Sequence, residues 1–412
     1  MLNVSEALEK LLNAFSPVEV EEVPLHKAVG RVLSASIASQ LDLPLFSNSS
    51  MDGFAVIAED VENAHPDKPV SLSVVEDIPA GSFPSKKLDR AQTARIMTGA
   101  PLPEGADAIV PVEDTDQFAR YLHSETEFPT KVNINKNVQP GDYVRFKGED
   151  VSNGDVVFEA NTKLRPQDIG LLAMLGIANV SVFRRPRIVI LSTGDELVPV
   201  EIPLQPGKIH DSNAYTLSAL IARDGGDAIY LGIVPDKEES VREILETAAE
   251  SRADLILSSA GVSVGAFDFV RTVVQQDGKL DFWRVNMRPG KPLAFGNFHN
   301  VPFIGLPGNP VSAFVGYEVF VRPAISRLAG LKNFTRNQIR ATIRHEIHSD
   351  GRESFLRAVL EKQEDGSWSA RLTGHQGSGN LLSLVQANAL LIIPSGVKSL
   401  PSGSDVDAWL LN

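Results

Sequence analysis

Residues 187–197 read RIVILSTGDEL, and this stretch decides the fold class of the central part of the chain. The run RIVIL is continuous, apolar and largely β-branched, as expected of a strand that is buried on both faces of a parallel sheet. The small and acidic residues STGDEL follow it directly. A buried parallel strand that ends in a polar loop predicts an α/β sheet with a ligand site at its edge.

Helix and strand patterns alternate after this stretch. The segment NAYTLSALIARDGG is expected to form a helix with Asn213 as its N-cap and Gly225 at its end. AIYLGIV has the pattern of a strand, and Asp236 with Glu239 predicts a capping box that opens the next helix, KEESVREILETAAE. Strands that alternate with helices predict a doubly wound sheet.

The alternation continues to about residue 330. DLILSS and PFIGL have the composition of further buried strands, and helices are expected to begin near Phe267 and at Asn309-Pro310. Residues 181–330 are therefore predicted to form one α/β domain.

The flanking regions have a different composition. Short β-like runs such as VSLSVV and ADAIVPV, broken by proline and glycine, predict an inserted β-rich domain at residues 41–145. The helical pattern RPQDIGLLAMLGIANV is expected to pack back onto the N-terminal helix, so that residues 1–40 and 146–180 form one discontinuous linker domain. Strand patterns with a turn at Asp365-Gly366 predict a small β-barrel at residues 331–412.

The bulk composition excludes several functional classes. A chain of 412 residues is too long for one core, and its formal net charge of -13 disfavours binding of nucleic acid or of an anionic membrane. The absence of cysteine excludes disulfides, thiol catalysis and cysteine-ligated metals. Because no apolar run approaches the ~20 residues of a membrane span and the N-terminus lacks a signal-peptide pattern, the protein is expected in the cytoplasm.

Three glycine-rich loops follow the predicted strands, at residues 192–197 (STGDEL), 258–268 (SSAGVSVGAFD) and 305–310 (GLPGNP). The carboxyl ends of parallel strands lie at one edge of a sheet, so the three loops are expected to line one pocket. Their glycines let backbone amides approach a bound group, and the helix N-termini after Gly265 and Asn309 favour an anion.

Cations and acids both lie near this pocket. MRPGKP, at residues 287–292, adds Arg288 and Lys291, and its two prolines are expected to hold both cations towards the same side. Four acids lie at or beside the strand ends: Asp195, Glu196, Asp236 and Asp268. Carboxylates repel a phosphate unless a hard cation lies between them, which predicts a phosphorylated or nucleotidyl ligand bound with Mg2+. In the alternative, Asp236 only caps a helix and Asp195-Glu196 is a solvated turn.

Familiar enzyme fingerprints are missing. The chain has no P-loop motif and no G-x-G-x-x-G, so P-loop and dinucleotide sites are not supported. Ser258, Ser259 and Ser263 lack the G-x-S-x-G context of a nucleophilic serine. Hydroxyls in a glycine loop more often bind phosphate.

A second candidate lies in FSNSSMDGFAV, residues 46–56. Small polar residues before Asp-Gly are ordinary turn chemistry, because Asn and Asp bond to their own backbone and glycine accepts positive φ. The local pattern therefore leaves open whether Asp52 belongs to a turn or to a site.

Taken together, these segments resemble one family, the molybdopterin molybdenumtransferases or MoeA proteins, which are similar to the E domain of gephyrin. The matching segments occur in the family's order: SNSSMDGFAV, RIMTGAPLPEGADAIV, GEDV, LSTGDEL, HDSN, GVSVGAFD, MRPGKP, GLPGNPVSA and GHQGSG. Each is weak alone, and the collinear set is specific.

The resemblance implies a fold and a reaction. It implies an elongated homodimer of four-domain subunits, in which the discontinuous N-terminal domain serves dimerisation. The third domain resembles the molybdopterin adenylyltransferase fold, and the fourth is a β-barrel. The implied reaction inserts molybdate into adenylylated molybdopterin, with Mg2+-dependent release of AMP. Molybdopterin adenylyltransferase and molybdoenzyme maturation proteins are expected as further partners.

The resemblance also implies roles for individual residues. Asp268, Asp236 and Glu196 would hold the metal and act in catalysis with Asp52 and Lys291. The substrate would contact Thr98, Glu113, Asp150, Thr193, Gly261, Ser263, Gly265, Pro307 and Asn309. Molybdate would be received by Arg288, Lys291, Arg357 and Ser378, with Arg352 as a further candidate. The third domain of the partner subunit would be faced by Asp52, Thr98, Glu113 and Asp150. For Asp52, the resemblance therefore favours a role in a functional site over a role in a turn alone.

The sequence departs from the family at four positions. Arg288 replaces a usual Lys and Ala260 a usual Gly, while Phe54 and Phe267 replace Tyr residues whose hydroxyls could have bound ligand. Two alternatives stay open: a protein that binds or adenylylates molybdopterin without inserting metal, and a dimeric scaffold. The choice between molybdate and tungstate is also open.

Overall fold

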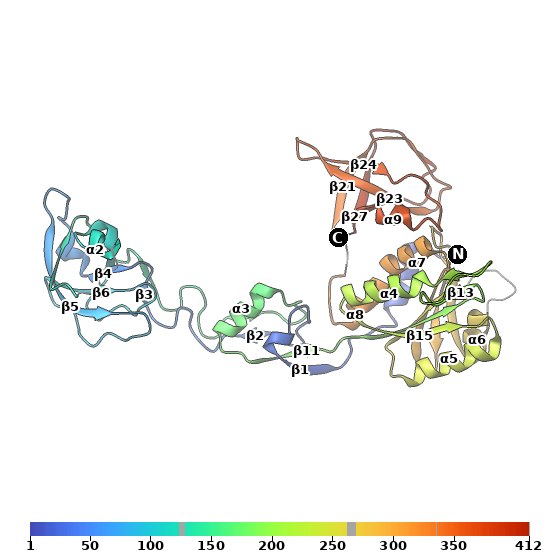
Figure 1. The fold of residues 1–412 in the computed structure, drawn as a ribbon, viewed down its shortest axis with the longest axis horizontal. Coiled ribbons are helices and arrows are strands. Elements are labelled where there is room, and N and C mark those ends of the chain that lie inside the picture. Colours follow the sequence, from blue (N-terminus) through green and yellow to red (C-terminus); the bar gives the residue numbers. More distant parts are fainter. Residues whose placement is uncertain (123–127, 262–268, 335, 412) are drawn as a thin grey trace. The chain divides into compact units, whose positions relative to one another are not determined.

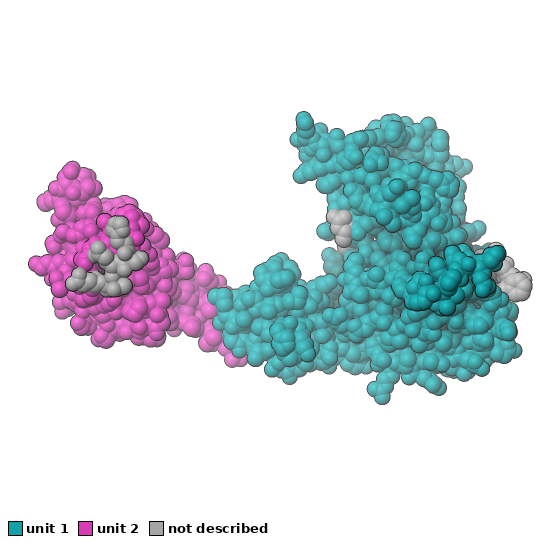
Figure 2. Space-filling model, viewed as in Figure 1, with its two compact units in different colours: residues 1–35, 160–412 teal, residues 36–159 magenta. Residues whose placement is uncertain are grey.

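The computed structural model describes residues 1–122, 128–261, 269–334 and 336–411. The chain divides into two compact units, one of residues 1–35 with 160–412 and one of residues 36–159 (Figure 2). The boundaries of the four predicted domains stay a prediction.

Residues 36–159 are built around a five-stranded sheet with the order β7-β4-β6-β5-β8 (Figure 1). Its strands are β4 (Gly53–Val56), β5 (Val70–Ile78), β6 (Gln92–Ile96), β7 (Ala108–Pro111) and β8 (Lys131–Ile134). Shorter elements complete the unit: β2 (Ile37–Ala38) with β10 (Val156–Phe158), β3 (Asn48–Ser49) with β9 (Val144–Arg145), η2 (Ala58–Val61), η3 (Val112–Asp114) and α2 (Phe118–Leu122). Phe54 lies in the core of this unit and is 1% exposed. Its side chain therefore packs among other apolar residues, and the expectation that a Tyr hydroxyl at this position could have bound ligand stays a prediction.

The doubly wound sheet predicted from residues 187–197 is confirmed. Its order is β15-β12-β16-β20-β19-β17, in which the first four strands are parallel and the last two antiparallel. The strands are β12 (Arg187–Thr193), β15 (Asp227–Val234), β16 (Leu255–Ser259), β17 (Gly278–Arg284), β19 (Pro292–Phe298) and β20 (Val301–Leu306). The sequence predicted neither β17 nor β19. Most side chains of the edge strand β17 are partly exposed and leave no continuous apolar run, and β19 begins at Pro292 and contains Gly296, two residues that disfavour a strand.

Helices cover both faces of this sheet (Figure 1). Ile188 and Ile190 pack into one core, whereas Val189 and Leu191 pack into the other, as alternation along a buried strand requires. The first core is covered by α1 (Val4–Leu12), α4 (Ser212–Arg223), α7 (Pro310–Gly316), the π-helix η4 (Tyr317–Val321) and α8 (Arg322–Leu328). The second is covered by α5 (Glu238–Glu250) and α6 (Phe269–Asp277).

Two predicted helix caps are wrong. The N-cap of α4 is Asp211, whose Oδ1 accepts a hydrogen bond from the Ala214 amide at 3.1 Å. Asn213 lies inside the helix, because its side chain is used in a tertiary contact between two loops. The N-cap of α5 is Lys237 without a side-chain cap bond, so Asp236 forms no capping box.

The expected packing of α3 (Pro166–Met174) onto the N-terminal helix is also wrong. The apolar face of α1, including Ala7 and Leu11, is buried in the α/β core, where α4 and α8 offer a larger apolar surface. Instead, α3 packs beside η1 (Leu25–Lys27), next to the antiparallel pair of β1 (Val20–Pro24) and β11 (Asn179–Phe183).

The C-terminal strands close into the predicted barrel. The ring runs β23-β24-β21-β27-β25, and β25 pairs back to β23. Its strands are β21 (Gln338–Ile343), β23 (Glu353–Lys362), β24 (Trp368–Leu372), β25 (Ala389–Ile393) and β27 (Asp405–Leu410).

Minor elements are β13 (Leu197–Val198) with β14 (Ile209–His210), β22 (Ile347–His348) with β26 (Ser399–Leu400), and α9 (Leu382–Val385). The strand β18 (Met287–Arg288) pairs with β23 and joins the α/β domain to the barrel.

Within the described residues, no helix has the length and apolar character that a membrane span needs.

Candidate functional site

The loops at the carboxyl ends of β12, β16 and β20 meet at one edge of the sheet. The Ala260 amide donates to the Leu306 carbonyl at 3.0 Å, which joins the second loop to the third. The Asn213 amide group donates to Ser259 Oγ and to the Gly308 carbonyl, each at 2.8 Å. The sequence placed Asn213 at a helix cap and missed this role, although HDSN was among the matching segments. A side chain from α4 thus holds two of the loops together.

Thr193 and Gly261 lie against each other at this edge. Gly261 has φ +74°, and a Cβ there would lie 2.9 Å from Thr193 Oγ1 and 2.5 Å from Val270 Cγ2. Only glycine fits at this position. The Thr193 hydroxyl is buried and has no hydrogen-bond partner within the described part of the chain. The predicted residues Ser263, Gly265 and Asp268, which follow Gly261 in the same loop, lie outside the described residues.

Three acids follow the first two strands of the sheet. The Asp236 amide donates to Asp195 Oδ1 at 3.2 Å. The Glu196 carboxylate folds back onto Gly194, where a Cβ would lie 2.6 Å from it. Among the described residues, no group of three or more His, Asp or Glu side chains could hold a metal ion. The donor set fits Mg2+ only if substrate phosphate oxygens supply further ligands, which is the usual arrangement for this ion.

Arg288 lies where the α/β domain meets the barrel. Its Nη1 is 3.8 Å from Asp350 Oδ2, and Arg352 binds the same carboxylate at 2.5 Å through Nη2. Arg352 also donates to the Met287 carbonyl at 3.2 Å. The hydrogen bonds from Arg352 lower the pKa of Asp350 to about 2. One carboxylate therefore holds both cations next to β18.

Arg357 lies on β23 and is fully buried. Its guanidinium donates to the carbonyls of Gln376, His375 and Gly377 at 3.3, 3.3 and 2.9 Å, and to Ser383 Oγ at 2.9 Å. Burial, and then the charge of Arg288, lower the pKa of Arg357 to about 10. Arg357 is therefore still a cation at neutral pH, and the hydrogen-bond partners described for it are neutral.

The loop that Arg357 holds is GHQGSG, which carries Ser378. The Ser378 carbonyl accepts a hydrogen bond from the Val311 amide at 3.0 Å, in the first turn of α7. Asn309, the N-cap of α7, lies 4.0 Å from the position of a Cβ on Gly379. Pro307 is buried in the loop before this helix. The barrel loop thus docks beside the α/β loop that contains Pro307 and Asn309.

The residues around Lys291 differ from those around Arg288. It lines a cavity of about 540 Å3 together with Trp283, Arg284 and the N-terminal residues. The guanidinium carbons of Arg271 and Arg284 lie 3.7 and 4.2 Å from the centre of the Trp283 ring. The sequence pattern did not single out Trp283. The described contacts join no single group to both Arg288 and Lys291, so the expectation that both face one side stays a prediction.

Asp52 is the centre of a second cluster, within residues 36–159. Its carboxylate accepts from the Thr98 amide and hydroxyl and from the Tyr121 hydroxyl, each at 2.7 Å. Burial acts to raise the pKa of Asp52, but these three bonds outweigh it and hold the pKa below its usual range. The bond to Asp52 raises the pKa of Tyr121, and the negative charge of Glu113 adds a smaller rise.

The sequence missed Tyr121 in this cluster, because it lies on a short helix far along the chain from residue 52. Asp150 is exposed, and its amide bonds to the Leu43 carbonyl at 2.9 Å. The described bonds bring Asp52, Thr98 and Tyr121 together and do not join Asp150 to them.

Ala260 adopts a backbone conformation that favours glycine. Its φ is +81°, in the left-handed region, where a Cβ is unfavourable. The loop keeps this geometry with alanine, at a cost in strain. The departure at Arg288 alters the geometry of the hydrogen-bond donors, and the departure at Ala260 raises the energy of the backbone. Phe267 lies outside the described residues.

Three family models match most of the chain. Residues 2–176 match the MoeA N-terminal region (domain I and II), residues 189–327 the probable molybdopterin binding domain, and residues 340–411 the MoeA C-terminal region (domain IV).

Individual relatives match over almost their whole length. A molybdopterin molybdenumtransferase of Nostoc sp. (strain PCC 7120) is 41% identical over 397 residues, which is 95% of this chain and 88% of that protein. That of Haemophilus influenzae is 36% identical over 98% of both. Among solved structures, the molybdopterin biosynthesis moeA protein of Pyrococcus horikoshii OT3 has a TM-score of 0.82 at 31% identity and 100% coverage of both chains.

Proposed function

The chain belongs to the MoeA family of molybdopterin molybdenumtransferases, and from this premise we propose that it inserts molybdenum from molybdate into adenylylated molybdopterin and releases AMP. The observation that carries the proposal is the meeting of two kinds of group within one compact unit. Glycine loops suited to phosphate lie at the edge of the α/β sheet, and arginines suited to an oxyanion lie where this edge meets the barrel.

The arginines support an oxyanion site. Arg357 is a buried cation whose described hydrogen bonds go to neutral groups, and Arg288 adds a second charge close enough to lower its pKa. The described carboxylate beside these cations is Asp350, 3.8 Å from Arg288, and the positive charge that remains around Arg357 favours a dianion such as molybdate. Arg352 and Ser378 lie beside the same junction, and Lys291 follows Arg288 by three residues in the same loop.

The glycine loops support the phosphate end of the substrate. The buried Thr193 hydroxyl lacks a described partner, and Gly261, whose φ is +74°, packs directly against it. As two Mo–S bonds form, one molybdate oxygen would leave with the two thiol protons as water. Cleavage of the phosphoanhydride consumes one water, and AMP leaves while molybdopterin keeps its own phosphate. The protein would hold both phosphates in place, which orients the bond for attack.

Mg2+ is part of the proposal. Asp236 and Glu196, with Asp268, would hold it beside the phosphates. The ion would neutralise charge that these carboxylates could not tolerate next to a phosphate. Asp52, with Thr98, Glu113 and Asp150, would form a second functional cluster in a cytoplasmic homodimer.

The test combines purified protein, adenylylated molybdopterin, Mg2+ and molybdate, and follows AMP release and reconstitution of an apo-molybdoenzyme. We expect AMP only with molybdate, and a loss of at least about tenfold in rate for Arg357→Lys, which keeps the charge and loses the planar fork. Lys362→Gln, an exposed change in the same barrel, should keep the rate. Nucleotide binding without AMP or active cofactor would refute insertion and favour a binding or scaffold role.

A further inference from the structure

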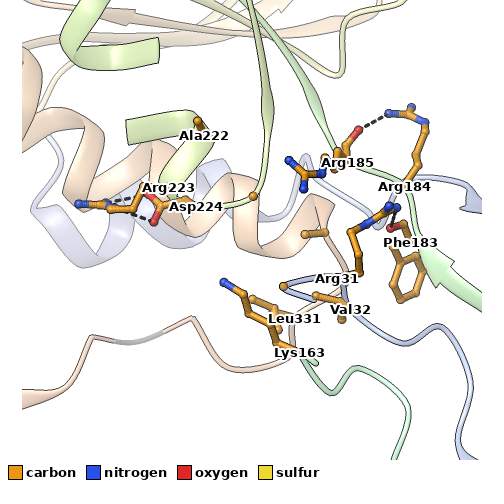
Figure 3. Close-up of a pocket in the computed structure, with 13 residues that line it drawn as sticks. Arg31, Val32, Lys163, Phe183, Arg184, Arg185, Ala222, Arg223, Asp224 and Leu331 are labelled. Atoms are coloured by element: carbon orange, nitrogen blue, oxygen red, sulfur yellow. Dashed lines mark hydrogen bonds and ion pairs between the residues drawn. The ribbon is translucent and has the colours of Figure 1, made fainter. Parts of the chain in front are cut away.

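A small cationic pocket lies beside Arg185 and Asp224, which precede the strands β12 and β15 of the α/β sheet (Figure 3). It is found where the β1–β11 pair meets the C-terminal ends of α4 and α8, and its volume is about 130 Å3. Five of the residues that line it are cationic and one is acidic: Arg31, Lys163, Arg184, Arg185, Arg223 and Asp224. This composition is unexpected in a chain with a formal net charge of -13.

Two of the five cations bind two carboxylates each. Arg184 binds both oxygens of Asp254, at 2.6 and 2.7 Å, and also Glu19. Arg223 binds Asp224 at 2.8 Å and Glu318 at 3.0 Å. These pairs form part of the wall and leave little charge for a ligand.

The other three cations have at most one described acid partner each, Glu21 for Arg31 and Asp227 for Arg185, and they keep donor groups that no described hydrogen bond uses. Arg31 is only 9% exposed, and both its described bonds, to Glu21 and to the Phe183 carbonyl, use Nη2 alone. The nearest described acid to Arg185 is Asp227, 3.9 Å away. The ammonium group of Lys163 has no ion pair or hydrogen bond among the described residues. In Figure 3, Arg31, Lys163 and Arg185 come from three different segments around one space.

Helix ends do not account for these cations. The C-terminus of a helix attracts positive charge because its last carbonyls lack partners. At the end of α4, however, the Ala222 and Ile221 carbonyls accept from the Gly225 and Gly226 amides. At the end of α8, the Arg327 and Ser326 carbonyls accept from the Gly330 and Leu331 amides. Backbone amides therefore cap both helices, and Arg31, Lys163 and Arg185 are not needed for this purpose.

We propose that this pocket binds one tetrahedral phosphate group, either inorganic phosphate or the phosphate of a small monoester. Its volume is well below the roughly 300 Å3 of a drug-sized pocket, so it admits a single phosphate group and excludes a nucleotide. Three donors from separate segments match the charge and the oxygens of a phosphate. The bound anion would link residues 31 and 163 to residue 185, and so tie the β1–β11 segment to the α/β domain. The site is independent of the insertion reaction.

The test is calorimetric titration of the full chain with inorganic phosphate and, separately, with glycerol phosphate. We expect the wild type to bind phosphate and to gain about 2–4 °C in Tm at ten times the Kd. The double variant Lys163→Gln with Arg185→Gln should bind at least about tenfold more weakly. Binding of both ligands would identify a monoester site, and binding of phosphate alone a site for the free anion.

Two further variants separate this pocket from other phosphate sites. Lys332→Gln with Lys362→Gln makes the same change in charge at exposed positions that do not line the pocket, and should leave the Kd within twofold. Lys291→Gln changes the candidate active site and should also retain binding. Unchanged affinity in the Lys163 and Arg185 variant, loss of binding in Lys291→Gln, or no binding by the wild type would each overturn the proposal.

Discussion

Asp52 receives three hydrogen bonds at 2.7 Å, and all of them favour its ionised form. Two come from Thr98, which the sequence had singled out, and the third comes from Tyr121, which it had not. A carboxylate held in this way keeps a fixed orientation, which a residue in an ordinary turn would not need.

Replacing Tyr121 by Phe should raise the pKa of Asp52 towards 3.8, because one of three bonds to the charged form is lost. We expect a loss of about 0.5–1 kcal/mol in unfolding free energy at pH 7. Because the folded-state pKa of Asp52 is depressed, this difference should fade as the pH falls below 3.8 through that pKa. Carbon NMR of the carboxyl group and urea unfolding measure both effects. Tyr143→Phe, in the same unit, serves as control, and an unchanged Asp52 pKa would contradict the assignment.

Replacing Ala260 by Gly should stabilise the protein. The left-handed φ of +81° strains alanine, and relief of that strain exceeds the extra freedom that glycine gives the unfolded chain. We expect the free energy of unfolding to rise by roughly 0.5–1 kcal/mol. The opposite sign is expected for Ala219→Gly in the interior of α4, where glycine costs about as much. Thermal unfolding of the two variants provides the comparison, and a loss at Ala260 would show that the loop is not strained there.

At the scale of elements, the join between β18 and β23 depends on one acid. Asp350 binds Arg352 and lies near Arg288, and Arg352 reaches back to the Met287 carbonyl. Ion pairs therefore link the two-residue strand β18 to the segment just before β23, beside the candidate oxyanion site.

Arg352→Gln should raise the pKa of Asp350 from about 2 towards 3.8. The folded-state pKa is depressed, so the stabilisation is present above pH 3.8 and is lost as the pH falls towards 2. Since both side chains are partly exposed, screening limits the effect to about 0.5–1 kcal/mol at pH 7. Urea unfolding at pH 7, 5 and 3 tests the trend. Arg371→Gln, whose partner is Glu361, should leave Asp350 unaffected, and a pH-independent loss in Arg352→Gln would argue against this ion pair.

At the scale of the larger compact unit, a buried ionic network connects the barrel with the α/β domain. Arg336, at the start of the barrel, binds Glu318 on the π-helix η4 and the Leu410 carbonyl on β27. The Glu318 side chain is fully buried and also pairs with Arg223 at 3.0 Å. Tyr317, the preceding residue of the π-helix, donates to Asp224 at 2.9 Å. This one turn of π-helix presents adjacent residues to the same network.

Arg336→Met should cost roughly 3–5 kcal/mol, because it leaves a buried carboxylate with one partner fewer. Arg340→Met removes an exposed pair with Asp407 in the same barrel and should cost less than about 1 kcal/mol. Urea unfolding compares the two. In the double variant with Glu318→Gln the loss should be smaller than the sum of the single losses, since the uncompensated charge is gone. Equal losses for Arg336→Met and Arg340→Met would show that the network does not join the domains.

The amino-acid sequence by itself determined the fold class and the family. Residues 188–191 are all apolar, so both faces of this strand carry apolar side chains. Only a sheet that is covered on both sides buries the two faces. The glycine at 261 and the N-cap at Asn309 are local requirements of φ and of helix initiation, so they too could be read along the chain. The collinear motifs then identified the MoeA family, which the comparisons confirmed.

Only the tertiary structure decided which distant residues meet. The packing of α1 into the α/β core, the bond from Tyr121 to Asp52 and the bridge from Asn213 to two loops join residues that are far apart in sequence. The neutral partners of Arg357 and the cations around the pocket of Figure 3 likewise depend on how separate segments pack. Local patterns report backbone preferences and periodicity, whereas burial and partnership arise when segments pack together, and these contacts set the charge and pKa of each site.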